Sequence, residues 1–443
     1  MENIIKRYKA CLDAGKTERE CIRLATKMAE EAGYKSLNEC IEENSELKAG
    51  DKVYATYNEK TMVMFHIGKN DIEKGMNILG AHVDSPRLDI KQNPLYEDNG
   101  MAYLDTHYYG GIKKYQWVTI PLALHGVIVK KDGTKVDVVI GEKEDDPVFC
   151  ISDLLIHLSR EQLEKNARKV IEGEKLDLLI GNSPMEGEEK DAVKSNILNI
   201  LKDMYNVEEE DFLSAELEVV PADKARDMGL DRSMVMAYGQ DDRICAFTSL
   251  FAMLDIETPD RTACCILVDK EEIGSNGASG MHSRFFENMV AEVLQLTGHT
   301  SDISVRRSLS NSKMLSSDVN AAYDPLFPEV FEKKNTAFLS KGLVFSKFTG
   351  SGGKSGSNDA NAEYIAKLRN IMDANNVKFQ FAELGRVDAG GGGTIAYITA
   401  QYGMEVIDSG LAILCMHAPM EVSSKADICE AVKGYKAFLT EMK

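Results

Sequence analysis

The chain has 443 residues, of which 44% are hydrophobic and 28% charged, and its formal net charge is −19 at pH 7. This length exceeds one simple core and predicts two domains, or one domain with a large insertion. The negative charge argues against nucleic acid or an anionic membrane surface as a partner. No apolar run approaches a membrane span, and residues 1–33 have the spacing of an amphipathic helix rather than of a signal peptide. Nine cysteines without a CxxC pair predict reduced core thiols in a cytoplasmic protein, and the adjacent Cys264 and Cys265, in an apolar run, are interpreted as packing residues.

The first part of the chain places a histidine and an aspartate at the end of a strand. Helices are expected up to about residue 44, followed by strands at 53–57 and 61–67. A third apolar strand then runs into His82 and Asp84, and Pro86 ends it. Side chains two apart on a strand project from the same face, so Asp84 could fix the tautomer of a metal-binding His82. A surface pair at a strand end is the alternative.

Residues 93–228 differ in composition and are interpreted as a module inserted between the two parts of the main domain, at 1–92 and 229–443. Strands at 122–129 and 135–140 flank a hairpin turn signal at 131–134. Residues 147–166 are predicted to be helical and contain His157, which composition alone favours as a core or helix-surface residue. A helix at 190–205 and a strand at 215–221 complete the module.

Acidic residues follow the next predicted elements. Asp241 precedes an apolar helix at 244–254, a position that suits capping as well as chemistry. Glu271 and Glu272 follow a buried strand at 262–268, just before Gly274. Adjacent carboxylates repel unless a cation lies between them or one is protonated, and a metal ion meets that need. A solvated turn is the alternative for this pair.

Two further candidates complete a set of ligands at strand ends. Asp318 follows a short apolar run, and a strand at 411–415 leads to His417. In open α/β sheets, ligands gather at the carboxyl ends of the strands. Two imidazoles with several carboxylates, one of them able to bridge, suit a pair of zinc ions.

Two glycine-rich stretches are candidates for binding loops. Residues 349–357 resemble a phosphate loop, but position 348 is Phe where the Walker pattern requires glycine, so nucleotide binding is rejected. A loop at the rim of a pocket is the preferred interpretation, with Lys354 available to an anion. The run at 389–394 most simply permits a tight turn or a close backbone approach.

The order of six motifs resembles the aspartyl aminopeptidase and vacuolar aminopeptidase I family of zinc metallopeptidases, over nearly the whole chain. The motifs are GAHVDSPRLDIK, GQDDR, DKEEIGSNGASG, SSD followed by DP, GGGGT and MHAPMEV. The resemblance implies an α/β fold with a mixed central sheet between helices and an inserted, mainly-β dimerisation domain. It implies a tetrahedral dodecamer whose sites face an inner chamber that admits short peptides.

The same resemblance implies a role for each matching residue. One metal would be held by His82, Asp318 and a bridging Asp241, and the other by Asp241, Glu272 and His417. Glu271 matches the general base, and Asp84 the residue that orients the first histidine. His157 matches the histidine that the inserted domain lends to the neighbouring subunit. The expected cofactor is two divalent ions: zinc suits the histidines, and cobalt or manganese also suits such oxygen-rich sites.

One departure bears on specificity. The aspartate-specific members are expected to have a histidine shortly after the acid that matches Asp318, but Val319, Asn320 and Ala321 follow here. The first residue of the substrate could therefore be acidic or neutral. Two alternatives remain: the glutamyl or deblocking tetrahedral aminopeptidases, which share a similar order of ligands, and a non-catalytic peptide-binding shell, which would predict a broken ligand set.

Overall fold

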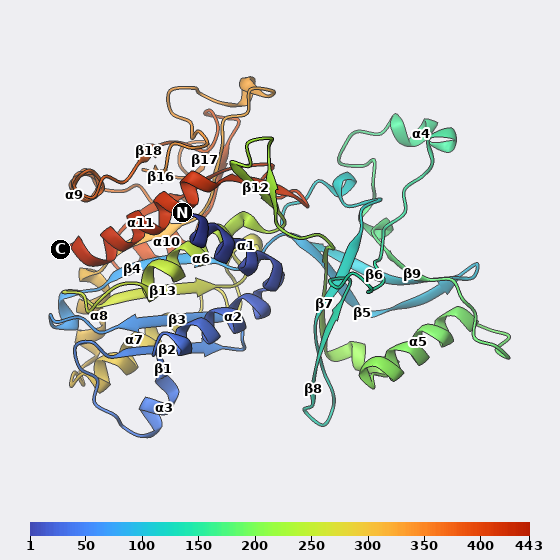
Figure 1. Ribbon diagram of the computed structural model, residues 1–443, viewed down its shortest axis with the longest axis horizontal. Coiled ribbons are helices and arrows are strands. Elements are labelled where there is room, and N and C mark those ends of the chain that lie inside the picture. Colours follow the sequence, from blue (N-terminus) through green and yellow to red (C-terminus); the bar gives the residue numbers. More distant parts are fainter. The chain divides into compact units, whose positions relative to one another are not determined.

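The computed structural model describes all residues from Met1 to Lys443. They form two compact units. The first comprises Met1–Asp84, Ala225–Met416 and Glu421–Lys443, and the second comprises Ser85–Lys224 and His417–Met420. Both units are drawn in Figure 1, and each is described here by itself.

A nine-stranded mixed sheet forms the centre of the first unit (Figure 1). Across the sheet the strands are β1 (Lys35–Ser36), β2 (Lys52–Tyr57), β3 (Thr61–His66), β13 (Ala263–Val268), β4 (Asn77–His82), β14 (Lys313–Ser317), β20 (Glu405–Gly410), β16 (Leu343–Ser346) and β18 (Phe379–Phe381). The four strands β13, β4, β14 and β20 run parallel. Their carboxyl ends therefore share one edge of the sheet.

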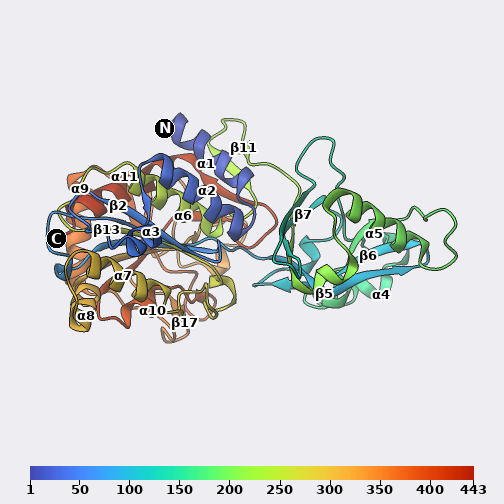
Figure 2. The same cartoon turned by 90° about the horizontal axis from the view of Figure 1, so that it is seen from below.

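Helices cover both faces of this sheet, as Figure 2 shows. One face carries α1 (Glu2–Ala14), α2 (Glu18–Glu31), α6 (Gln240–Leu254), α9 (Ala362–Ala374) and α11 (Lys425–Glu441). The other carries α3 (Leu37–Glu42), α7 (Phe285–Leu296), α8 (Asp302–Asn311) and α10 (Ala396–Ala400). All six residues of β13 are buried, with Cys265 in one core and Cys264 in the other, because successive side chains point to opposite faces. The predicted packing role of these two cysteines is confirmed.

Two smaller sheets belong to the same unit. A five-stranded sheet has the order β11 (Arg226–Met228), β12 (Met234–Ala237), β22 (Glu421–Ser424), β21 (Ala412–Leu414) and β15 (Asn320–Ala321). A two-stranded ribbon pairs β17 (Gly350–Ser351) with β19 (Gly391–Gly392). The two glycine-rich stretches of the sequence thus contact one another through their backbones. Close approach explains the glycine at 391, where a Cβ atom would lie 2.1 Å from the carbonyl oxygen of Gly350.

The second unit contains a six-stranded antiparallel sheet. Its order is β8 (Lys135–Ile140), β7 (Leu122–Val129), β10 (Ala215–Pro221), β5 (Arg87–Asp98), β6 (Met101–Tyr109) and β9 (Leu178–Gly181). Strands β7 and β8 form the predicted hairpin, with Val129 opposite Lys135. The main helices of this unit are the short α4 (Arg160–Leu163) and the longer α5 (Ala192–Tyr205). The expected mainly-β character of the insertion is confirmed.

The helix predicted at 147–166 is wrong. That stretch holds only a 3-10 turn at Ile156–Leu158 and the single turn of α4. Its apolar residues have helical spacing, but Leu155, Ile156 and Leu158 are 54–69% exposed. Most of the stability of a helix comes from packing an apolar face, and this segment has no such face to pack within its own unit.

None of the helices combines the length and the apolar composition that crossing a membrane requires. No disulfide bond joins any of the nine cysteines. Six of them are buried, while Cys415 is exposed, so the prediction of core thiols holds for most but not all of the set.

A buried carboxyl in β20 predicts how stability depends on pH. Asp408 is 3% exposed and accepts a hydrogen bond from the Thr394 hydroxyl. Burial raises the pKa of Asp408 from 3.8 to about 7, against the opposing effect of that hydrogen bond. A raised pKa in the folded state means that the contribution of Asp408 to stability is complete below pH 3.8 and is lost as the pH rises through about 7.

Asp408→Asn has no carboxyl proton to lose, and its amide oxygen still accepts the Thr394 bond. We therefore expect its stability, relative to the unsubstituted protein, to increase as the pH rises from 4 to 7. The expected gain in the free energy of unfolding is on the order of a few kcal/mol. Urea unfolding at several pH values, with a chelator to remove bound metal, measures it. A difference that does not change with pH would contradict the assignment.

Candidate metal centre

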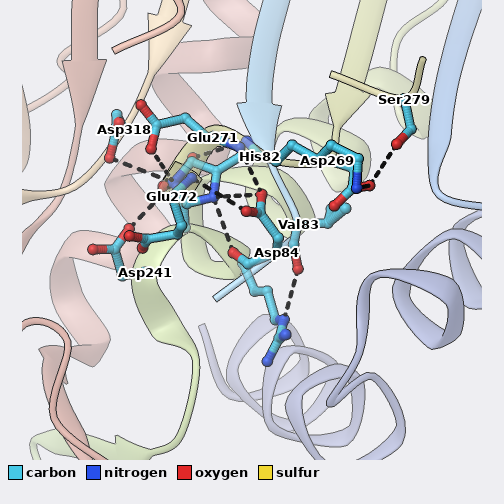
Figure 3. A network of polar contacts seen from close by, with 12 residues as sticks. His82, Val83, Asp84, Asp241, Asp269, Glu271, Glu272, Ser279 and Asp318 are labelled. Atoms are coloured by element: carbon cyan, nitrogen blue, oxygen red, sulfur yellow. Dashed lines mark hydrogen bonds and ion pairs between the residues drawn. The ribbon is translucent and has the colours of Figure 1, made fainter. Parts of the chain in front are cut away.

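The predicted ligands of the first unit meet at one edge of the nine-stranded sheet. His82 is the last residue of β4, and Asp318 follows β14 directly. Glu271 and Glu272 begin the 3-10 turn Glu271–Ile273 after β13, and Asp241 lies in the first turn of α6. Parallel strands bring their carboxyl ends together, which is why residues so distant in sequence converge here. Figure 3 shows the carboxylates gathered around the His82 ring.

His82 lies at the centre of the cluster and is 2% exposed. Its Nε2 atom lies 3.3 Å from Asp241 Oδ1, 3.9 Å from Glu271 Oε2 and 3.9 Å from Asp318 Oδ1. Its Nδ1 atom lies 3.0 Å from the backbone carbonyl oxygen of Asp84, so an Nδ1–H can donate to that oxygen. This bond favours the neutral tautomer in which Nε2 carries the lone pair that binds a metal.

The donor set fits a divalent cation. One nitrogen and two carboxylate oxygens, from His82, Asp241 and Asp318, lie within 4.8 Å of one another. Zinc bonds of about 2.0–2.2 Å place neighbouring tetrahedral ligand atoms about 3.3–3.6 Å apart, close to the 3.3 Å between His82 and Asp241. His82 Nε2 is buried and makes no hydrogen bond. A metal ion would satisfy this buried lone pair.

Charge in the cluster supports the same interpretation. Burial opposes protonation of His82, but the nearby carboxylates of Asp241 and Asp84 raise the pKa of His82 well above its ordinary value. Burial, then the neighbouring Asp242, raises the pKa of Asp318 well above its ordinary value. Both shifts arise where several carboxylates lie close together in a buried place. A divalent cation would stabilise the ionised carboxylates there.

A tight turn of the backbone sets the positions of the two adjacent glutamates. Lys270 adopts a left-handed conformation with φ of 69°, and Gly274 closes the turn with φ of 92°, a conformation that glycine allows. The Glu271 side chain is only 15% exposed. The alternative of a solvated turn therefore does not describe Glu271, whose side chain faces the cluster in Figure 3.

Asp84 has a second contact that the sequence did not predict. Its carboxylate accepts the backbone N–H of Glu271 and that of Glu272, each at 3.2 Å. Its Oδ1 atom also lies 3.4 Å from His82 Nδ1. One fully buried carboxylate therefore positions the histidine and both glutamates.

We expect Asp84→Asn to lower kcat/KM by about 10–100-fold, because the amide offers one acceptor where the carboxylate offers two. Metal content measured beside activity separates loss of ligand from loss of geometry. Asp89→Asn, on the partly exposed Arg87–Asp89 pair, is the matched control and should retain activity. Unchanged kinetics in Asp84→Asn would show that the two backbone bonds are dispensable.

Sequence reasoning also missed the residues that position Asp241. The backbone N–H of Asp241 donates to Glu421 Oε2 at 3.0 Å. The buried Gln240 side chain donates to the Glu421 carbonyl oxygen and accepts from the hydroxyls of Tyr8 and Ser423. Gln240 and Glu421 belong to the GQDDR and MHAPMEV motifs, which could have drawn attention to them. No sequence pattern indicates that side chains so far apart in the chain hydrogen-bond to one another.

Three further predicted residues are described here by their own surroundings. His417 belongs to the segment His417–Met420 of the second unit, where its Nδ1 atom lies 2.8 Å from the Gly111 carbonyl oxygen. His157 is exposed in the second unit and borders a cavity of about 890 Å³. Lys354 donates to Asp359 Oδ2 at 3.1 Å and lies over the Phe348 ring.

Comparison with known proteins identifies the family. The model of the aminopeptidase I zinc metalloprotease (M18) family matches residues 11–439. The chain belongs to this family. The match confirms the resemblance stated above and makes the protein an M18 zinc metalloaminopeptidase, in preference to the glutamyl or deblocking family.

Relatives of this M18 chain match over nearly its whole length. A probable M18 family aminopeptidase 1 from Clostridium acetobutylicum is 61% identical, over 98% of this chain and 93% of its own length. The crystal structure of an M18 family aminopeptidase from Thermotoga maritima is 43% identical with a TM-score of 0.96, covering 100% of this chain and 96% of the other. The aminopeptidase I structure from Clostridium acetobutylicum has a TM-score of 0.91 at 59% identity, covering 98% and 95%.

Proposed function

We propose that this M18 aminopeptidase uses two divalent ions, zinc in the first instance, to remove the N-terminal residue of short peptides. The single observation that carries the proposal is the convergence of three carboxylates on the buried Nε2 atom of His82. His82, Asp241 and Asp318 would hold the first ion. A complete donor set is a signal of function, which weighs against the non-catalytic alternative.

The second ion would share Asp241 with the first and add Glu272 and His417. Carboxylate oxygens of Asp241 and Glu272 lie within 4.8 Å of one another, which supports a shared ion. The contact between His417 Nδ1 and the Gly111 carbonyl supports a neutral His417 whose Nε2 atom carries the ligating lone pair. The family resemblance supplies the pairing of His417 with these two acids.

Glu271 would act as the general base. Its carboxylate is directed into the cluster, with Oε2 3.9 Å from His82 Nε2, and is not needed as a ligand of either ion. Bound divalent ions would polarise the scissile carbonyl and lower the pKa of the attacking water. Glu271 would accept the proton of that water and deliver it to the leaving amine. Asp84 would keep Glu271 in place through the backbone bond described above.

We propose a neutral rather than an acidic first residue in the substrate. Lys354, the candidate partner for an acidic side chain, already pairs with Asp359 at 3.1 Å. The chain also lacks the histidine expected after Asp318 in the aspartate-specific members. An acidic substrate side chain would need a cationic partner of this kind, because charge-assisted hydrogen bonds are about twice as strong as neutral ones.

A panel of aminoacyl p-nitroanilides tests both parts of the proposal. Zinc-reconstituted protein should release p-nitroaniline from the Leu substrate in preference to the Asp, Glu and Lys substrates, and a chelator should abolish release. Faster release from Asp or Glu would overturn the neutral preference and point to Lys354. No release from any substrate, with two ions bound, would overturn the catalytic proposal itself.

We further propose that the second unit makes dimers that assemble into a dodecamer, with His157 lent to the neighbouring subunit. Three large apolar residues beside His157, namely Leu155, Ile156 and Leu158, are exposed and would be covered by a partner. A related yeast structure is an mApe1 dodecamer. Light scattering on the purified protein should give the mass of twelve chains, and a monomeric mass would refute the assembly.

A further inference from the structure

Helix α5 of the second unit is fixed at both of its ends. At the first turn, Glu97 Oε2 accepts the backbone N–H of Val193 at 2.8 Å and that of Lys194 at 3.0 Å. A carboxylate there also suits the positive end of the helix dipole. At the last turn, the Tyr205 hydroxyl donates to the Val139 carbonyl oxygen at 3.3 Å. These contacts hold the helix against the sheet at two separate points.

Between those points the apolar side of α5 is only partly packed, with Ile197 against Gly181 of β9. Ile197, Ile200, Leu201 and Met204 recur at the spacing of one helix face and line a cavity. Only Val193 in the whole helix is buried, and Ile200 and Met204 are 42% and 54% exposed. An amphipathic helix ordinarily gains most of its stability by burying such a stripe. Here a large part of the apolar surface of the stripe is left unburied.

The cavity beneath α5 has a volume of about 670 Å³. Its opposite wall is formed by apolar side chains of the sheet, including Leu124, Val138 and Leu217, and no charged side chain lines it. Protein interiors are close-packed, and cavities of about 300–1,000 Å³ are the size that holds small-molecule ligands. Apolar cavities exclude water and bind apolar molecules instead.

Acidic residues adjoin the cavity at its rim, where Val148 lines it and is 54% exposed. Glu144, Asp145 and Asp146 directly precede Pro147 and Val148, and Lys143 is the one cation among residues 142–146. After burial, the carboxylate of Asp146 contributes to raising the pKa of Tyr205, which lines the cavity. Asp146 accepts backbone hydrogen bonds from Gly141, Glu142 and Lys143, which hold the pKa of its carboxyl below the ordinary value. A ligand with an anionic head group would meet repulsion at this rim.

We propose that this cavity is a binding site for a neutral, long-chain aliphatic molecule, separate from peptide hydrolysis. The hydrocarbon chain would lie between the stripe of α5 and the sheet, and an uncharged head group would lie beside the acidic rim. The cavity does not suit a peptide, because its lining is almost wholly apolar and offers few partners for the polar groups of a peptide backbone.

Equilibrium dialysis of the intact oligomer with 1-dodecanol, and with laurate as the anionic counterpart, tests the proposal. We expect saturable binding of about one dodecanol per chain, with laurate bound at least about tenfold more weakly. Leu201→Trp and Ile200→Phe, which fill the cavity to different extents, should each abolish or weaken binding. Ile303→Trp, on the exposed face of α8 in the other unit, is the matched control and should bind normally.

Circular dichroism of each variant shows whether it is folded, and Ile200→Phe covers the case in which Leu201→Trp does not fold. Equal binding of laurate and dodecanol would overturn the charge preference. Absence of saturable binding, or binding that persists in both folded variants, would overturn the site; the first result is also expected if a second copy of the chain fills the cavity in the oligomer.

Discussion

Glu271→Gln should retain its metal ions and lose nearly all turnover, with kcat falling by about 10³–10⁴-fold. The substitution keeps the shape of the side chain and the backbone bond to Asp84, but an amide cannot accept a proton from water. Because Glu271 is proposed as a base and not as a ligand, metal content by elemental analysis should stay at that of the unsubstituted protein. KM should change little.

The matched control is Glu257→Gln, an exposed glutamate of the same unit that lies outside the cluster. It should behave as the unsubstituted protein in both measurements. Normal turnover in Glu271→Gln would remove this residue from the mechanism. Loss of metal together with turnover would instead show that Glu271 is a ligand, and the assignment of Glu272 would then need revision.

Asp241→Ala should lower the bound metal from two ions per chain to less than one and reduce hydrolysis to the background rate. Asp241 is the one residue shared by both candidate sets of ligands, so its removal takes a ligand from each ion. It is also 3% exposed and lies nearest to His82 Nε2 among the acids around that atom. Titration with zinc, followed by elemental analysis and assay, measures both effects.

Asp203→Asn, on an exposed aspartate of α5, controls for the loss of one negative charge and should change neither quantity. Two tightly bound ions in Asp241→Ala would rule out the bridging role. One retained ion with no activity would show that Asp241 binds only one of the two ions. The ligands assigned to the ion at His82 would then need to be tested one by one.

Much of the metal centre could be predicted from the sequence because strand ends are visible in it. An apolar run of five or six residues that stops at His82 or just before Asp318 predicts where a strand ends. The carboxyl ends of parallel strands lie at one edge of the sheet, so these residues are expected to meet there. The resemblance of the motifs then assigned each residue to an ion. The same local logic identified the β7–β8 hairpin from its turn residues.

The errors arose where local pattern and tertiary packing disagree. Residues 147–166 have helical spacing, but the exposed Ile156 and its neighbours have no core to cover within their unit. The support of the site was missed for a related reason. Asp84 bonds to backbone groups of Glu271 and Glu272, 187 and 188 residues away along the chain, and backbone groups carry no signature in a sequence.

The sequence by itself determined the class of the sheet, the ends of its strands, the family and the candidate ligand residues, because these depend on residue type and short-range order. Only the tertiary structure decided that Asp84 holds the two glutamates, that Glu421 holds Asp241, and that α5 stands over a cavity. Such features depend on distances between remote segments, which are set by how whole layers pack. Hydrogen bonds and voids belong to that packing, and no periodicity encodes them.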